Sequence, residues 1–198
     1  MPKVIADITM SLDGYVTGPG ADAEHGLGDA EELHTWVMDQ DPVDTEILER
    51  STAETGAVVM GRRLFDVVDG PDGWTNDMGY GAQQAGTPPF FVVTHDPPQQ
   101  VRLDRELGMR FTFLPDLPAA IDQARAAAGD GHVMIMGGGD VIGQALERGL
   151  VDELRLHLAP MLLGGGRPLF RAGTRQLYRQ REVRPSRNAV HLIYERLA

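Results

Sequence analysis

Apolar residues recur with two different periods along the chain, and these periods predict its strands and helices. Val4, Ala6, Ile8 and Met10 alternate with more polar residues, which indicates a strand at residues 4–12. Further strands are predicted at residues 57–60, 90–93, 109–114, 133–136 and 154–158, and helices at residues 31–38, 44–55 and 117–128. Another helix is expected to begin after residue 139 and to end at Gly149, which readily adopts a left-handed conformation.

The order of these elements predicts the fold class. Short buried strands that alternate with helices imply a mainly parallel sheet. Residues 176–183 and 189–197 are expected to close the chain as a hairpin. We therefore expect an α/β fold in a single domain over residues 1–198, with a mixed, mainly parallel sheet flanked by helices and a C-terminal antiparallel hairpin.

Polar or glycine-rich residues follow several of the predicted strands. In open α/β sheets, ligands bind beyond the carboxyl ends of the strands. The residues at these ends are Ser11 to Asp13, Gly61 to Arg63, Thr94 with His95, and Gly137 to Gly139. We expect them to form one composite site. Two alternatives remain open. In one, Arg62 and Arg63 are solvent-exposed residues at the start of a helix. In the other, the first strand is an edge strand whose polar side faces water (a wet edge).

The triple glycine of residues 137–139 joins a buried strand to a helix. Bare backbone amides at the positive end of a helix can bind a phosphate, because no Cβ keeps the anion away. A tight turn without a ligand is the alternative. Asp140 would repel a phosphate unless its carboxylate caps the helix amides and points away. A second triple glycine, residues 164–166, precedes no predicted helix and is interpreted as a structural turn.

Composition narrows the possible partners. The chain has 198 residues, a net charge of −11 and no cysteine. The negative charge disfavours nucleic acid and anionic membranes as partners. The lack of cysteine excludes disulfides and thiolate nucleophiles, and it fits a cytoplasmic protein. The six histidines are too scattered to predict a metal site, and the N-terminal apolar run is too short for a signal or membrane segment.

Four short motifs together resemble a known family. They are Ser11-Leu12-Asp13-Gly14-Tyr15, Val59-Met60-Gly61-Arg62, Met136-Gly137-Gly138-Gly139 and Pro160-Met161-Leu162-Leu163-Gly164. In this order, and over nearly the whole chain, they resemble the dihydrofolate reductase-like superfamily. The closest branch is the reductase domain of riboflavin biosynthesis, the carboxy-terminal half of bifunctional deaminase-reductases. The zinc deaminase domain of those enzymes has neither room nor cysteines here, so the reductase would stand alone.

The resemblance implies NADPH as the cofactor and hydride transfer to a C=N or C=O group. It implies that the pyrophosphate is held by Met136, Gly137, Gly138, Gly139, Asp140, Val141 and Ile142. The adenosine-side phosphates would be held by Gly61, Arg62 and Arg63, with Thr94 and His95 near the 2′-phosphate. The first strand and its turn would lie beside the nicotinamide and the substrate. Asp13 and Asp7 are thus candidates for proton relay or substrate contact, and Thr9, Ser11, Gly14 and Trp36 for substrate binding, with Trp36 as pocket wall.

The leading hypothesis is a reductase of a small heterocyclic (pyrimidine- or pteridine-like) or carbonyl substrate, resembling 5-amino-6-(5-phosphoribosylamino)uracil reductase. Dihydrofolate reduction and a non-catalytic nucleotide-binding protein are the alternatives. The acid that contacts the pterin in dihydrofolate reductases would fall near Thr45, flanked by Asp44 and Glu46, and neither is assigned. A homodimer built around the carboxy-terminal strands and residues 160–170 is expected, because apolar residues cluster there.

Overall fold

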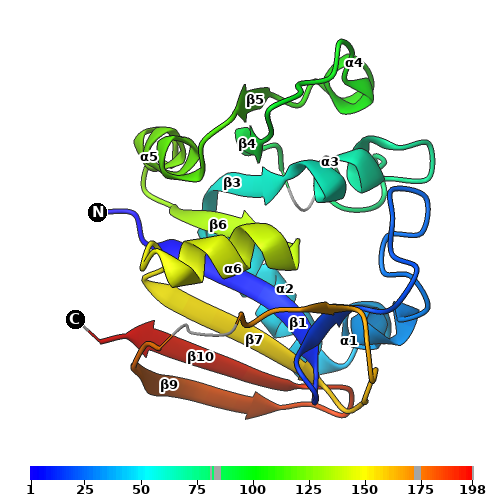
Figure 1. Ribbon diagram of the computed structural model, residues 1–198, viewed down its shortest axis with the longest axis vertical. Coiled ribbons are helices and arrows are strands. Elements are labelled where there is room, and N and C mark those ends of the chain that lie inside the picture. Colours follow the sequence, from blue (N-terminus) through cyan, green and yellow to red (C-terminus); the bar gives the residue numbers. More distant parts are fainter. Residues whose placement is uncertain (81, 83–85, 172–174, 198) are drawn as a thin grey trace.

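An eight-stranded sheet organises the computed structural model, which describes residues 1–80, 82, 86–171 and 175–197 (Figure 1). Its strands are β1 (Val4–Ser11), β3 (Thr55–Gly61), β4 (Phe90–Val93), β5 (Phe111–Leu114), β6 (His132–Met136), β7 (Glu153–Ala159), β9 (Tyr178–Pro185) and β10 (Val190–Arg196). They lie in the order β5-β4-β3-β6-β1-β7-β10-β9. The first six in this order are parallel, and β10 runs antiparallel to both β7 and β9.

Helices cover both faces of this sheet. They are η1 (Glu31–His34), α1 (Thr35–Met38), α2 (Pro42–Glu54), α3 (Arg62–Asp69), α4 (Arg102–Leu107), α5 (Leu117–Ala127) and α6 (Gly139–Glu147). The larger apolar core joins α5 and α6 to one face, and a second core joins α3 to the other face at β3 and β4. A small sheet of β2 (Tyr15–Thr17) and β8 (Arg167–Pro168) lies beside α6.

The sheet face beneath α2 is polar where it is formed by β1, β7 and β10. In β7 the leucines point to the α6 side, so Glu153, Arg155 and His157 point to the α2 side, and all three are buried. The Arg155 guanidinium lies 2.6 Å from a carboxylate oxygen of Glu54 in α2 and 2.7 Å from one of Glu153. This layer therefore replaces apolar packing with paired charges.

The predicted fold class is confirmed, and most predicted elements agree with the observed ones within a few residues. α4 was not predicted. Six residues are too few for a stable isolated helix, and tertiary contacts hold this one. The Asp69 carboxylate accepts from the amides of Arg102 and Leu103, and the Arg102 guanidinium donates to the Val68 and Trp74 carbonyls.

Residues 81 and 83–85, between α3 and β4 in the sequence, lie outside the described residues. Within the described ranges, no helix is long and apolar enough to cross a membrane.

Candidate functional site

Four parallel strand ends share one edge of the sheet. β4, β3, β6 and β1 are neighbours in this order and run in the same direction (Figure 1). Their carboxyl ends lead into Thr94, Arg62, Gly137 and the turn after Ser11. The residues expected to form a composite site therefore do meet at a common edge.

The glycine turn between β6 and α6 has a conformation that favours glycine. Gly137 and Gly138 have φ values of 54° and 72°, which side chains with a Cβ rarely adopt. A Cβ on Gly137 would lie 2.5 Å from Cδ2 of Leu64, whereas one on Gly138 would meet no heavy atom within 4 Å. The backbone at Gly138 is therefore open to a ligand.

Two backbone amides after this turn have no hydrogen-bond partner among the described residues. The amides of Val141 and Ile142 donate to the Gly138 carbonyl, so those of Gly139 and Asp140 precede the first helical hydrogen bonds. The side chains of Val141 and Ile142 are buried in the core and can take no part in binding. The first turn of α6 therefore presents backbone amides to a ligand.

Asp140 does not cap the helix amides but pairs with arginines. Its carboxylate contacts the guanidinium of Arg167, lies 3.1 Å from that of Arg171 and 4.0 Å from that of Arg63. Three positive charges around one negative charge leave the start of α6 net positive. The repulsion that the sequence suggested between Asp140 and a phosphate is thereby offset.

Arg62 and Thr94 meet at the ends of β3 and β4. Arg62 pairs with Asp66 at 2.7 Å and also donates to the Asp96 carbonyl. Thr94 Oγ1 accepts from the Asp96 amide at 3.1 Å. The side chains of Arg63 and His95 are exposed beside them.

Gly61 has a packing role at the same edge. A Cβ on Gly61 would lie 2.7 Å from Cγ2 of Val141, so its absence lets α6 approach the end of β3.

Asp13 is bound within its own turn and to a distant loop. Its carboxylate accepts from the Ser11 hydroxyl at 2.6 Å and from the amides of Gly164 and Leu163 at 2.7 and 3.1 Å. Chiefly the bonds from Ser11 and Gly164 lower the pKa of Asp13 to about 2. Asp13 is therefore ionised at neutral pH and fastens the second triple-glycine loop to the end of β1. Gly14, with φ of 91°, completes the turn.

Asp7, Thr9 and Trp36 come together beneath α2. The Asp7 carboxylate lies 2.8 Å from Nε2 of His157 and accepts from the Ser51 hydroxyl at 3.1 Å. Trp36 Nε1 donates to Thr9 Oγ1 at 2.9 Å, and its ring centroid lies 4.3 Å from that of His157. Burial alone would raise the pKa of Asp7, but the adjacent His157, with help from Arg155 and Ser51, holds that pKa below its ordinary value.

Two histidines that the sequence left unassigned extend this group. His157 Nδ1 lies 2.7 Å from His191 Nδ1, and His191 Nε2 lies 2.7 Å from Oδ1 of Asp44. Glu46, in contrast, is exposed and pairs with Arg184. One feature of the sequence could have pointed to this group. Arg155 and His157 occupy the polar positions of β7, a strand with a neighbouring strand on each side, so their side chains need partners within the protein.

The register of the sheet relates the Asp7 group to the glycine turn between β6 and α6. Asp7 is the partner of Met136 in the β1–β6 pairing, and Met136 directly precedes the glycine turn. The Asp7 group thus lies at the level where the glycine turn begins.

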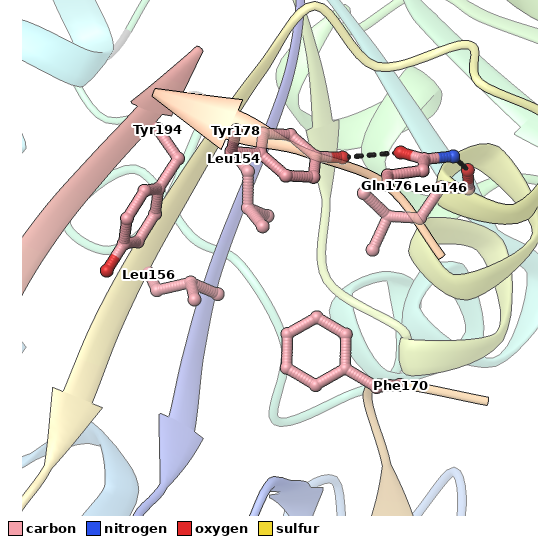
Figure 2. Close-up of a pocket in the computed structure, with 7 residues that line it drawn as sticks. All are labelled: Leu146, Leu154, Leu156, Phe170, Gln176, Tyr178 and Tyr194. Atoms are coloured by element: carbon pink, nitrogen blue, oxygen red, sulfur yellow. Dashed lines mark hydrogen bonds between the residues drawn. The ribbon is translucent and has the colours of Figure 1, made fainter. Parts of the chain in front are cut away.

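A separate apolar pocket of about 380 Å³ lies toward the C-terminal end of α6. Figure 2 shows the ring of Phe170 facing the leucines of β7, while Tyr178 donates to Gln176. The pocket is lined by Leu146, Leu154, Leu156, Phe170, Gln176, Tyr178 and Tyr194. None of the expected site residues lines it.

Solved structures of similar fold come from reductases and their relatives. A putative riboflavin biosynthesis protein from Shewanella sp. PV-4 is 24% identical, with a TM-score of 0.69 and 99% of each chain covered. RibD from Acinetobacter baumannii is 17% identical, with a TM-score of 0.67, all of this chain covered and 59% of that one. Dihydrofolate reductase from Enterococcus faecalis is 15% identical, with a TM-score of 0.59, 98% of this chain covered and 96% of that one.

Two sequence comparisons agree with this fold. The protein YyaP of Bacillus subtilis (strain 168), described as uncharacterized, is 24% identical over 172 residues, which is 85% of this chain and 80% of YyaP. The family model of the RibD C-terminal domain matches residues 2–192. The chain therefore belongs to the RibD C-terminal domain family.

Proposed function

We propose that the protein is an NADPH-dependent reductase of a small pyrimidine-like heterocycle. The observation that carries this proposal is the turn at Gly137 and Gly138, whose positive φ values leave open backbone at the start of α6. An anion suits this position, because free amides and three arginines surround it. The Enterococcus faecalis reductase of similar fold is described as complexed with NADP(H).

Each part of the dinucleotide has a matching group of residues. The amides of residues 138–140, with Arg63 and Arg167, would hold the pyrophosphate. Arg62 and Thr94 would hold the 2′-phosphate, with His95 exposed beside them, since a guanidinium pairs with phosphate oxygens in a bidentate manner. When bound, the reduced nicotinamide supplies a hydride to the acceptor carbon.

Asp7 is a better candidate than Asp13 for delivering the proton that accompanies hydride transfer to the substrate. The carboxylate of Asp13 is occupied by three hydrogen bonds from Ser11 and the loop after β7. The pKa of each of the two carboxyl groups is lowered, but Asp7 contacts the imidazole of His157, which can pass it a proton. Asp7 is partly exposed and lies beside Met136, next to the glycine turn. Asp7 and Thr9 would therefore contact the substrate, with Trp36 as the wall and Ser11 and Gly14 shaping the turn.

The position of Asp44 favours a pyrimidine over dihydrofolate. Its carboxylate is fully buried and bonded to His191, so it cannot contact a pterin ring without rearrangement. Among the relatives of similar fold, the Thermotoga maritima protein is described as a deaminase and 5-amino-6-(5-phosphoribosylamino)uracil reductase. We infer a substrate of that chemical class.

We also propose a homodimer in the cytoplasm. In the loop of residues 160–170, Leu162 and Phe170 are 72% and 49% exposed, while Leu169 is buried in its own core. A second copy would cover the exposed pair and the pocket beside Phe170. Sedimentation equilibrium should give twice the 21.6 kDa of one chain, and Phe170→Asp should shift it to 21.6 kDa; a monomeric wild type would refute the dimer.

The proposed activity is tested by adding NADPH to the purified full chain, first alone and then with candidate acceptors. We expect NADPH fluorescence to report binding, and a ribosylaminouracil substrate to oxidise NADPH faster than dihydrofolate does. Faster oxidation with dihydrofolate would support the pterin alternative. Binding without any oxidation would favour a non-catalytic nucleotide-binding protein.

A further inference from the structure

Four side chains from four different elements, three of them buried and one partly exposed, form an unbroken chain of hydrogen bonds. Asp7 of β1 contacts His157 of β7 at 2.8 Å, His157 contacts His191 of β10 at 2.7 Å, and His191 contacts Asp44 of α2 at 2.7 Å. The side chains of His157, His191 and Asp44 are 4%, 2% and 1% exposed, and that of Asp7 is 16% exposed. The chain is thus closed at Asp44 and open only at Asp7.

The number of protons in this chain follows from its contacts. Three hydrogen bonds between lone-pair-bearing atoms need three protons, but two neutral imidazoles carry only two. If both Nε2 atoms donate to carboxylates, two bare Nδ1 lone pairs would face each other at 2.7 Å. One additional proton, on an imidazole or a carboxyl group, removes this repulsion. The four side chains then carry a net charge of −1.

Burial and the neighbouring His157 lower the pKa of His191, whereas Asp44, Asp7 and the Trp36 ring favour a positive charge shared between the two imidazoles. The Trp36 ring packs against both imidazoles, with centroid distances of 4.3 Å to His157 and 5.1 Å to His191. An aromatic face stabilises a nearby cation. The other ionisable groups around the pair come from several elements: Asp7 of β1, Arg155 of β7, His34 of η1, Asp44 of α2 and, through the Asn188 amide, Asp39 after α1.

We propose that His157, His191 and Asp44 form a buried proton store that supplies Asp7 with a proton during substrate reduction. The role of this store rests on the proposed reductase function. The additional proton does not, because it follows from contacts within the protein alone. The proton in the hydrogen bond between His157 Nε2 and Asp7 moves onto the Asp7 carboxylate, and Asp7 passes it to the substrate nitrogen or oxygen. The proton between the two Nδ1 atoms then shifts toward His157. The store is left one proton short, and water restores that proton through Asp7.

The proton count is measurable without cofactor or substrate. In the ¹⁵N-histidine-labelled wild type at neutral pH, we expect three slowly exchanging imidazole protons on His157 and His191, which lose one proton in a single coupled step as the pH rises. In His191→Gln, only the proton shared with Asp7 should remain. Two neutral imidazoles at neutral pH, with neutral carboxylic acids excluded by carbonyl NMR, would overturn the store.

Single-turnover oxidation of bound NADPH tests the supply of the proton. We expect His191→Gln to slow it about tenfold and to move the pH midpoint by one unit or more, because an internal acid contributes at least this much. Asp44→Asn, which conserves volume, should move the midpoint in the same direction, and NADPH affinity should stay within twofold. An unchanged midpoint in both folded variants would overturn the relay, whereas lost stability alone marks a structural role.

His132→Gln is the matched control. His132 begins β6 on the amino-terminal side, and its buried Nδ1 has no hydrogen-bond partner among the described residues. The variant should keep the wild-type pH midpoint. If the wild type reduces none of the substrates, the proposed function fails, and the proton count still decides for or against the store.

Discussion

The Asp13 carboxylate accepts a 2.7 Å hydrogen bond from the backbone amide of Gly164, which lies 151 positions further along the chain. Together with the bonds from Ser11 and Leu163, this contact joins the end of the central strand to the loop after β7. An ionised carboxylate can accept all three bonds at once, and an amide cannot.

We expect Asp13→Asn to loosen that loop. Amide hydrogen exchange at Gly164 should speed up about tenfold, while amides in β6 keep their protection. Because the pKa of Asp13 is lowered from 3.8 to about 2, its contribution is fully present above pH 4 and is lost as the pH falls toward 2. Asp22→Asn, in an exposed loop where Asp22 accepts from two nearby amides, is the control that should leave Gly164 unchanged. Equal exchange at Gly164 in both variants would contradict the role of Asp13.

Arg62→Ala should weaken NADPH binding about tenfold and NADH binding less than threefold. Losing a charge-assisted hydrogen bond costs about 1.5–3 kcal/mol, and only NADPH carries the 2′-phosphate. Fluorescence titration of both cofactors measures the ratio. Arg105→Ala, on the surface of α4, is the control. If wild-type protein binds both cofactors equally, Arg62 does not contact a 2′-phosphate.

Gly138→Val should abolish NADPH binding while the fold survives. The positive φ of Gly138 would strain a β-branched residue by roughly 1–2 kcal/mol, and its side chain would project into the open space where the pyrophosphate is expected. Gly108→Val is a matched control, since Gly108 also has a positive φ of 65° and open space around it, but ends α4. Normal NADPH binding by folded Gly138→Val would show that the triple glycine is only a turn.

Arg155→Leu should lower the free energy of unfolding by about 3 kcal/mol. Removing one partner of a buried ion pair leaves the other charges uncompensated, here those of Glu153 and Glu54. Urea denaturation followed by circular dichroism measures the change. In Arg181→Leu, which breaks an exposed pair with Glu195, the loss should stay below about 1 kcal/mol. A similar loss in both variants would mean that burial adds nothing to the Arg155 pairing.

The sequence predicted the sheet and the shared edge of its glycine-rich and polar strand ends because both depend on local patterns. Apolar runs such as residues 90–93 and 133–136 became β4 and β6, and glycine after β6 marked the turn into α6. The polar side of β1 was expected to face a ligand cleft or water. β1 lies inside the sheet, which excludes the wet edge. On its polar side Asp7 and Thr9 are hydrogen-bonded to Ser51, His157 and Trp36, and Asp7 is still partly exposed, so contact with a ligand there stays a prediction.

The histidine chain could not be predicted in the same way. His157 and His191 are 34 positions apart, and they meet only because β7 and β10 pair in one particular register. Asp44 lies in the first turn of α2, where acidic residues are common, so its local sequence does not indicate a buried contact. Its contact with His191 depends on how α2 crosses the sheet, and no local pattern specifies that angle.

The central position of β1 has a consequence for the order of folding. β1 is the first strand to be synthesised, yet its neighbours β6 and β7 begin only at His132 and Glu153. Such long-range pairing slows folding, since the closure of a long loop precedes any gain from the contacts. During refolding, amides of β1 should become protected in the same slow phase as those of β7, which pulsed hydrogen exchange can resolve. On the ribosome, this buried strand must therefore stay unpaired until β6 has emerged, after more than two thirds of the chain has been made, and a chaperone can bind it during that long interval.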